Sequence, residues 1–514
     1  MPDESRHHTH ALTSLAEHPL GRTRVYAVMT ALMLTLLLQA IDQTMIGTAM
    51  PRIVASLAGF DRYVWAMTAY LLGSTVLLPI TGRLSDQFGR KHFVVGGTAL
   101  FVVGAALAGT ATTMGELIAF RAVQGIAAGI GITLVFAVIA DLFEPRDRAR
   151  WNGFFGAIYG FASFAGPTLG GWLADHGPLI SGFVADDTRW RWVFYIHLPF
   201  GLVALALLAV FLPHDVSERV TRERGWAAIR RIDFLGAGVG AAATILLMLA
   251  LTWVSNDREG WGSPRGLAGL AASALLFAAF YAVERRTSAE PILPLALLRI
   301  RDYGSAASLS LLVGMVMMSL AVFLPLYLQG VAVSSASRAG LAMLPLTLTS
   351  TISGTAVSMV LTRVGGRWRV IATGGAVLMF AGIVPMVFMT ATTPGWAVAA
   401  AMFAAGCGFG VYMPIITSLA QVVVPRSMMG VGTNAIGYLR SAGMMLGVAI
   451  VGAIVTSTLG AGGAPLAALR SGARVAGLES ALQSGFVAVA VFALAILVAT
   501  RLARDISIYG EQSR

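Results

Sequence analysis

An acidic residue, Asp42, lies within the apolar run "LTLLLQAIDQTMIGTAMP" over residues 34–51. A charged side chain in hydrocarbon is costly, so an acidic residue inside a membrane segment is expected to have a function. Thr35, Gln39 and Asp42 recur at intervals of three or four residues, which places them on one face of a helix. We predict that this face lines a polar cavity and that Asp42 carries a proton.

A second charge, Arg121, lies inside another apolar run. With a rise of 1.5 Å per residue, Asp42 lies about 12 Å and Arg121 about 8 Å from the outer ends of their helices, so the two charges are at similar depth. Burial favours the neutral acid and a nearby cation favours the carboxylate, so such a site can bind and release a proton. A purely structural ion pair is the alternative. His197, within a third run, could also titrate, but a hydrogen-bonded packing histidine is the simpler interpretation.

The elements that position these residues are predicted to be membrane-spanning helices. Hydrophobic residues make up 57% of the 514 residues and charged residues only 12%, whereas about 25% of a soluble domain is charged. A spanning helix needs about 20 apolar residues. Fourteen ranges qualify, namely 25–50, 63–81, 93–111, 116–140, 152–174, 192–212, 234–254, 265–283, 304–328, 338–361, 370–390, 395–420, 431–458 and 483–501. The sequence therefore predicts an all-α polytopic membrane protein.

The basic residues predict the orientation. With both termini inside, 25 of the 36 Lys and Arg residues fall in inner tails and loops and nine in outer loops. This asymmetry follows the positive-inside rule, so the net charge of +11 is no evidence for nucleic acid. The predicted domains are a cytoplasmic tail (1–24), a six-helix bundle (25–212), a linker with two extra spans (213–303), a second six-helix bundle (304–501) and a cytoplasmic tail (502–514).

The sequence indicates neither a cofactor nor a metal site. No G-x-x-x-x-G-K-[ST] loop occurs and the loops are too short for an ATPase domain, so transport would use the proton gradient or the substrate's own gradient. The histidines of "RHHTH" (6–10) lack an acidic or cysteine partner nearby and are expected in a solvated tail. The single cysteine, Cys407, excludes an intrachain disulfide.

The loop "GRLSDQFGRKH" (82–92) combines glycines that permit a tight turn with residues that can form ion pairs. With the segment "ADLFEPRDRARW" (140–151), it offers two candidate pairs across the inner end. Exposed pairs contribute only about 0–1 kcal/mol each, which suits a gate that must open and close. A basic turn that fixes orientation, beside a solvated loop, is the alternative. The candidate gate residues are Gly82, Asp86, Gly89, Arg90, Asp141 and Arg148.

The segment "GFASFAGPTLGG" (160–171) predicts a bent and closely packed helix. Pro167 removes a backbone hydrogen bond, and Gly166, Gly170 and Gly171 let another helix approach. A packing kink explains this pattern by itself. The functional interpretation is that a rigid bend seals one side of the cavity against leakage.

In order along the chain, these motifs resemble those of the major facilitator superfamily, and in particular its fourteen-helix drug–proton antiporters. The loop at 82–92 is similar to the signature G-x-L-a-D-r-x-G-r-k, and "LIAFRAVQGIAAGIG" (117–131) to R-x-x-q-G. The segment 160–171 is similar to the antiporter motif G-x-x-x-G-P-x-x-G-G, although Ala162 replaces its first glycine. "AIDQTMIGTAMP" resembles the acidic motif of the first span.

The resemblance implies two six-helix bundles plus two inserted helices, and it favours antiport over symport. The superfamily places the first and fourth spans side by side, so Asp42 and Arg121 are expected to meet directly, through water or through Gln124. Other polar and aromatic residues could line a substrate cavity, although packing explains each of them as well. The cavity candidates are Gln39, Gln124, Tyr159, Gln329, Asn434, Tyr438 and Arg440.

The function predicted from these observations is proton-coupled export of small hydrophobic or amphipathic compounds by a monomeric inner-membrane transporter. The partners are protons, the substrate and the lipid bilayer. A transporter of lipids or lipid precursors on the same fold is the alternative. A membrane sensor or channel is disfavoured, because neither a soluble signalling domain nor an ion filter is recognisable.

Overall fold

The computed structural model describes residues 21–143, 145–213, 234–256, 262–286, 295–332, 334–363, 367–424, 429–459 and 477–505, apart from some side chains within these helices. The described chain is almost entirely helical. The predicted tails at 1–24 and 502–514 lie mostly outside the described residues. Ten of the described helices are long and apolar enough to cross a membrane, and a helix or a helix pair covers each expected range.

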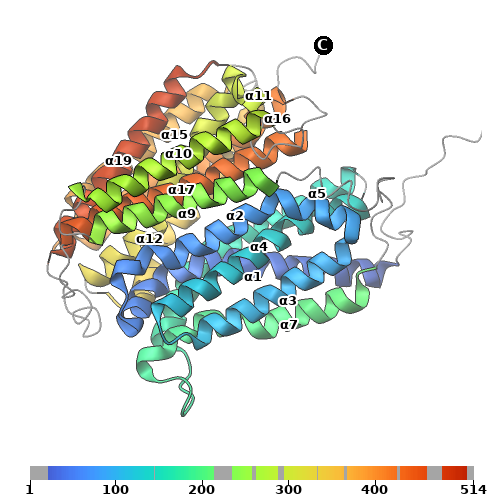
Figure 1. Ribbon diagram of the computed structural model, residues 1–514, viewed down its shortest axis with the longest axis horizontal. Helices are drawn as coiled ribbons and strands as arrows, with labels where there is room; N and C mark the ends of the chain where they lie inside the picture. Colours follow the sequence, from blue (N-terminus) through green and yellow to red (C-terminus); the bar gives the residue numbers. More distant parts are fainter. Residues whose placement is uncertain are drawn as a thin grey trace, which may run out of the picture.

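The helices form two groups joined by an inserted pair (Figure 1). The first group is α1 (Arg22–Leu57), α2 (Tyr63–Phe88), α3 (Arg90–Thr110), α4 (Met114–Leu142), α5 (Pro145–His176), α6 (Trp192–Tyr195) and α7 (His197–Phe211). The inserted pair is α9 (Phe234–Asn256) and α10 (Pro264–Arg286). The second group is α11 (Leu295–Leu298), α12 (Arg301–Gly330), α13 (Ala336–Ala342), α14 (Leu344–Arg363), α15 (Trp368–Ile383), α16 (Gly395–Val423), α17 (Met429–Leu459) and α19 (Leu478–Leu502).

Prolines explain where two expected spans are broken. A proline cannot donate the hydrogen bond to the carbonyl four residues earlier, and its ring clashes with that carbonyl. Pro199 accordingly follows the break between α6 and α7, and Pro345 follows the break between α13 and α14. Pro51 does not end α1, which continues to Leu57. The expected end of the first span at residue 50 was therefore seven residues too early.

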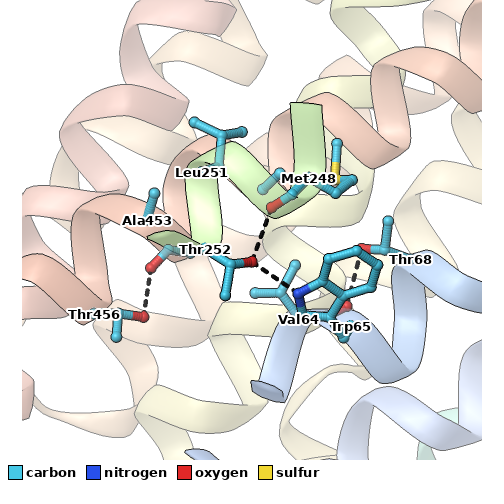
Figure 2. Close-up of a pocket in the computed structure, with 10 residues that line it drawn as sticks. Val64, Trp65, Thr68, Met248, Leu251, Thr252, Ala453 and Thr456 are labelled. Atoms are coloured by element: carbon cyan, nitrogen blue, oxygen red, sulfur yellow. Dashed lines mark hydrogen bonds between the residues drawn. The ribbon is translucent and has the colours of Figure 1, made fainter. Parts of the chain in front are cut away.

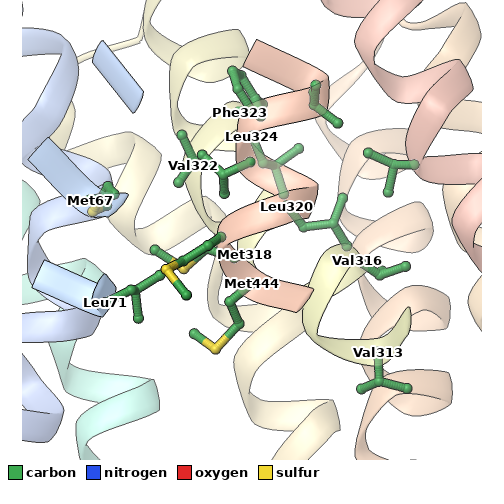
Figure 3. Close-up of a cluster of buried hydrophobic side chains, with 14 of the residues drawn as sticks. Met67, Leu71, Val313, Val316, Met318, Leu320, Val322, Phe323, Leu324 and Met444 are labelled. Atoms are coloured by element: carbon green, nitrogen blue, oxygen red, sulfur yellow. The ribbon is translucent and has the colours of Figure 1, made fainter. Parts of the chain in front are cut away.

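The two groups pack against each other through an apolar junction. Helix α1 contacts α12, α2 contacts α17, and α5 contacts α13. Met67 and Leu71 of α2 face Met318 of α12 and Met444 of α17 in one buried cluster (Figure 3). Methionines pack adaptably, so this junction can rearrange as the groups move.

The inserted helix α9 packs on both groups, against α2 and α17. The indole Nε1 of Trp65 on α2 donates a hydrogen bond to the Thr252 hydroxyl of α9, with a donor–acceptor distance of 2.8 Å (Figure 2). Around this bond lies a small cavity of about 30 Å³, which is room for a single water molecule. Helix α9 is thus attached beside the contact between α2 of the first group and α17 of the second.

Candidate functional site

The centre of the site is a buried ion pair between α1 and α4. Arg121 Nη1 lies 2.6 Å from Asp42 Oδ2, and the two side chains are 1% and 0% exposed. Breaking one partner of such a pair leaves an uncompensated buried charge, which costs about 3–5 kcal/mol. A negative charge on Asp42 is therefore stable only while the Arg121 guanidinium lies beside it.

Gln124 closes the pair into a three-residue network. Its Nε2 donates to Asp42 Oδ1 at 3.0 Å, and its Oε1 accepts from Arg121 Nη1 at 2.8 Å. The Arg121 guanidinium also lies 4.4 Å from the ring centroid of Tyr70 on α2, a favourable cation–π distance. Arg121 thus keeps partners of its own, so Asp42 can lose its charge without leaving the arginine isolated.

His197 approaches the same carboxylate from α7. Its Nε2 lies 3.9 Å from Asp42 Oδ1, and the side chain is fully buried. Its Nδ1 lies 3.1 Å from the Phe194 carbonyl oxygen. The sequence favoured a hydrogen-bonded packing histidine; the ring has this bond, and it also lies beside the charged centre.

Gln39 lies one helical turn before Asp42 and is 2% exposed. Its amide packs against Gly131 of α4 so closely that a Cβ at residue 131 would lie 2.0 Å from Gln39 Nε2. Neither amide atom has a hydrogen-bond partner within the described part of the chain. The predicted polar face of α1 therefore points into the α1–α4 contact.

The inner-end loop contains one of the two predicted ion pairs. Gly89 has φ of 93°, which favours glycine, and it separates α2 from α3 in a tight turn. Arg90 Nε forms an ion pair with the Asp141 carboxylate at the end of α4. Gly82 and Asp86 lie on α2 and Arg148 on α5, but their side chains are outside the described set.

The proline–glycine motif of α5 forms two close helix contacts. Thr44 of α1 packs where a side chain on Gly166 would stand, and Thr48 donates to the Pro167 carbonyl at 3.0 Å. Gly170 lies against Met45 of α1 in the same way. A Cβ on Gly171 would lie 2.1 Å from the Ala336 carbonyl oxygen of α13, in the other group. The motif therefore holds the two groups together.

A family model described as "Major Facilitator Superfamily" matches residues 32–448. The chain belongs to the major facilitator superfamily. It is a secondary transporter of the cell membrane that crosses the bilayer several times, and it is not an enzyme.

Relatives within the superfamily carry names that refer to drugs. "Multidrug transporter protein MdtP" of Bacillus subtilis (strain 168) is 33% identical over 433 residues, which cover 84% of this chain and 76% of that protein. "Multidrug resistance protein 3" of the same strain is 32% identical, over 84% of this chain and 79% of that protein.

A solved structure of the superfamily shares the fold. A bacterial homologue of the human lysosomal transporter Spinster, in an inward-facing and unoccupied conformation, aligns with a TM-score of 0.60 at 18% identity. The alignment covers 94% of this chain and 97% of that chain. At this identity the likeness concerns the fold alone.

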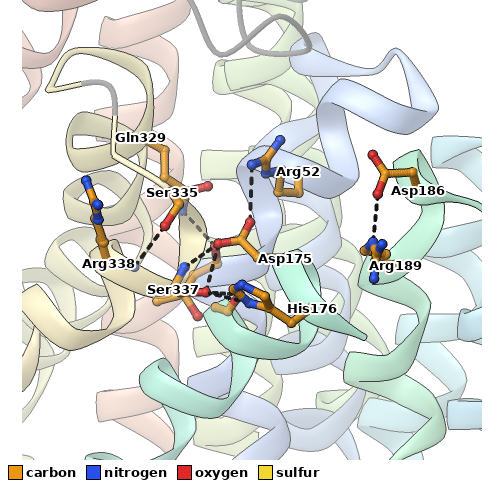
Figure 4. Close-up of polar contacts among 11 residues, drawn as sticks. Arg52, Asp175, His176, Asp186, Arg189, Gln329, Ser335, Ser337 and Arg338 are labelled. Carbon is orange, nitrogen blue, oxygen red and sulfur yellow. Dashed lines mark hydrogen bonds and ion pairs between the residues drawn. The ribbon is translucent and has the colours of Figure 1, made fainter. Parts of the chain in front are cut away.

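The two groups of helices meet tightly at the end where α1 stops and α2 begins. We call this the outer end, because the charge distribution predicts that it faces outward. Asp175 of α5 accepts two hydrogen bonds of 2.8 Å from Ser337 on α13, one from the backbone N–H and one from the hydroxyl (Figure 4). Its other oxygen lies 3.2 Å from Arg52 Nη2. No local sequence pattern indicates this cluster, because its partners come from three helices far apart in the chain.

A hollow of about 570 Å³ lies beside this cluster and is partly lined by Arg52, Asp175, His176, Asp186 and Arg189. Arg189 forms an ion pair with Asp186 there, at 2.8 Å, and the Asp186 side chain is 87% exposed. Asp175 is only 7% exposed. Of the two carboxylates, Asp175 therefore makes the stronger connection.

The predicted cavity residues lie in different places. Tyr159 of α5 lies near Arg440 of α17, in the other group of helices. Gln329 donates to the Thr48 carbonyl at 2.7 Å, in the contact between α12 and α1. Tyr438 lies near Gly240 of the inserted helix α9. The Asn434 side chain is outside the described set.

Proposed function

We propose that this protein is a proton-coupled exporter of small hydrophobic or amphipathic compounds, with fourteen spans and both termini in the cytoplasm. The observation that supports the proposal most is the buried network of Asp42, Arg121 and Gln124. A carboxylate enclosed between two helices can exchange its proton only when the surrounding helices move. This requirement connects protonation with the conformation of the transporter.

Export would follow from two alternating states. In the state with the outer end closed, Asp42 is ionised against Arg121, and substrate enters from the inside. Opening of the outer end lets a proton reach Asp42, which weakens its attraction to Arg121. Substrate leaves, the protonated protein returns, and Asp42 releases its proton to the inside. One proton moves inward for each substrate exported.

The drug names of the relatives and the single deeply buried carboxylate support the choice of substrate. Divalent cationic drugs would require further acidic residues in the cavity, so monovalent, neutral or zwitterionic compounds are the expected substrates. A pump-deficient bacterial strain that expresses the protein should tolerate higher concentrations of several such drugs. Unchanged sensitivity to the whole panel, with altered envelope lipids in a deletion strain, would support lipid transport instead.

The pair between Arg90 and Asp141 is expected to hold the inner end. The change Arg90→Gln removes the pair but keeps a polar side chain of similar length. Partly buried pairs of this kind contribute about 1 kcal/mol, so the ratio of inner-open to inner-closed states should rise about fivefold. Labelling of single cysteines placed near the inner end measures this ratio.

Lys91 provides the control for this prediction, since it neighbours Arg90 but, among the described residues, bonds the Ala209 carbonyl of α7 alone. Lys91→Gln should leave the labelling ratio unchanged. Equal labelling in Arg90→Gln and the unchanged protein would show that the Arg90–Asp141 pair does not hold the inner end closed.

Asp175 is expected to hold the outer end. Asp175→Ala removes two hydrogen bonds to Ser337 and one to Arg52. Hydrogen bonds to a charged group contribute about 1.5–3 kcal/mol each before losses from solvent exposure, so the outer-open state should gain at least tenfold in population. Distance measurements between spin labels on the outer ends of α5 and α13 report this opening.

The matched control is Asp186→Ala, which removes an exposed ion pair in the same hollow and should leave the label distances as they are. If Asp175→Ala behaves like this control, Asp175 has no part in closure.

A further inference from the structure

His197 has one nitrogen whose function the packing of the helices does not explain. The Phe194 carbonyl beside Nδ1 can only accept a hydrogen bond, so Nδ1 carries a hydrogen. In the neutral ring, Nε2 is then an acceptor with a free lone pair. Within the described residues this buried Nε2 has no hydrogen-bond partner, although the Leu38 carbonyl also lies near the ring.

The group that Nε2 approaches is the proposed proton carrier. Asp42 Oδ1 is 3.9 Å away, about 1 Å beyond a hydrogen bond. This separation suits two groups that both lack a hydrogen, since a lone pair on Nε2 and the negative carboxylate repel each other. A proton on Oδ1 would turn this unfavourable approach into a hydrogen bond.

We propose that His197 Nε2 accepts a hydrogen bond from the protonated Asp42 carboxyl group. This inference rests on the proposed function. A hydronium ion gives its proton to Oδ1, so one O–H bond of the hydronium breaks, the carboxyl O–H bond forms and a water molecule remains. The new O–H group donates to Nε2, and the ring stays neutral. Arg121 lies within the same buried space, so a second cation on His197 would be repelled. His197 is thus a positioning residue that stabilises the protonated state.

The other side chains around the pair do not provide this acceptor. Tyr70 of α2 lies with its ring under Arg121, and Tyr159 of α5 interacts with Arg440. On α3, Phe101 meets the His197 ring edge to face, with centroids 5.7 Å apart, and offers only packing. Gln124 already donates to Oδ1 and accepts from Arg121.

Infrared titration of the purified full-length protein in lipid nanodiscs tests the proposal without a substrate. A protonated carboxyl group gives a C=O band, and the band that disappears in Asp42→Asn belongs to Asp42. In His197→Leu, the pH at which half of this band has formed should fall by about one unit, which is tenfold weaker proton binding. The band should also move to higher frequency, because its O–H has lost an acceptor.

Two further variants distinguish the loss of a hydrogen-bond acceptor from a change in packing around the ring. His197→Gln offers an oxygen acceptor at similar reach and should restore most of the titration and the band position. Phe101→Leu alters the packing on the ring and should change neither. An Asp42 band that titrates in the same way in His197→Leu would overturn this inference alone. The absence of any Asp42 band between about pH 4 and pH 10 would overturn both it and the proton-carrier role of Asp42.

Discussion

The substitution Asp42→Asn is expected to abolish proton-driven export while the protein still inserts in the membrane. Asparagine keeps the shape and two hydrogen-bonding groups of the side chain but cannot carry a proton. Drug tolerance of the pump-deficient strain should fall to the level of the empty vector. Export down a substrate gradient, which needs no proton, should persist.

The size of this effect follows from the energy of one proton. A charge that moves through 100 mV releases about 2.3 kcal/mol, so a proton-motive force of about 150 mV supplies about 3.5 kcal/mol. Each factor of ten in concentration requires about 1.4 kcal/mol. The unchanged protein could therefore hold a neutral substrate at about a 300-fold gradient, whereas Asp42→Asn should hold none. Full drug resistance in the variant would contradict proton coupling through Asp42.

The second large effect is expected for Arg121→Ala. This change leaves Asp42 buried without its cation, at a cost of about 3–5 kcal/mol while Asp42 stays ionised. The protein should lose thermal stability, and Asp42 without its cation should no longer support transport. Thermal unfolding in detergent measures the loss of stability. The double variant Asp42→Asn/Arg121→Ala should be more stable than Arg121→Ala alone, because no unpaired carboxylate remains.

Arg52→Ala is the matched control for burial. Arg52 also pairs with an aspartate, but its side chain is 42% exposed, so the loss should be about 0–1 kcal/mol. Equal losses in Arg52→Ala and Arg121→Ala, or an additive double variant, would show that burial of the Asp42–Arg121 pair has no special energetic role.

Much of this arrangement could be predicted from local properties of the sequence. Apolar runs of the right length predicted where the helices lie, because a spanning helix must satisfy its own backbone. The rise per residue placed Asp42 and Arg121 at similar depth, although α1 extends further than expected. Their direct contact required the neighbouring arrangement of α1 and α4, which came from the resemblance to a family and not from spacing.

The remaining features depend on how distant helices meet. Asp175 and Ser337 are 162 residues apart, and neither stands out in composition. Their contact arises because Gly171 allows α13 to approach α5. His197 looked like a packing residue, since its own helix does not indicate that Asp42 lies opposite. Hydropathy likewise places Gln39 within a spanning helix but does not show that it faces Gly131.

The central claim is that one proton on Asp42 moves against one substrate molecule. The most direct measurement uses proteoliposomes with separately imposed pH gradient and voltage, a neutral substrate identified in the drug panel, and simultaneous recording of proton and substrate movement. We expect one proton per substrate, and no proton movement in Asp42→Asn. A ratio of two would require a second titrating group and contradict the single-carboxylate mechanism. Substrate accumulation without proton movement would contradict proton coupling itself.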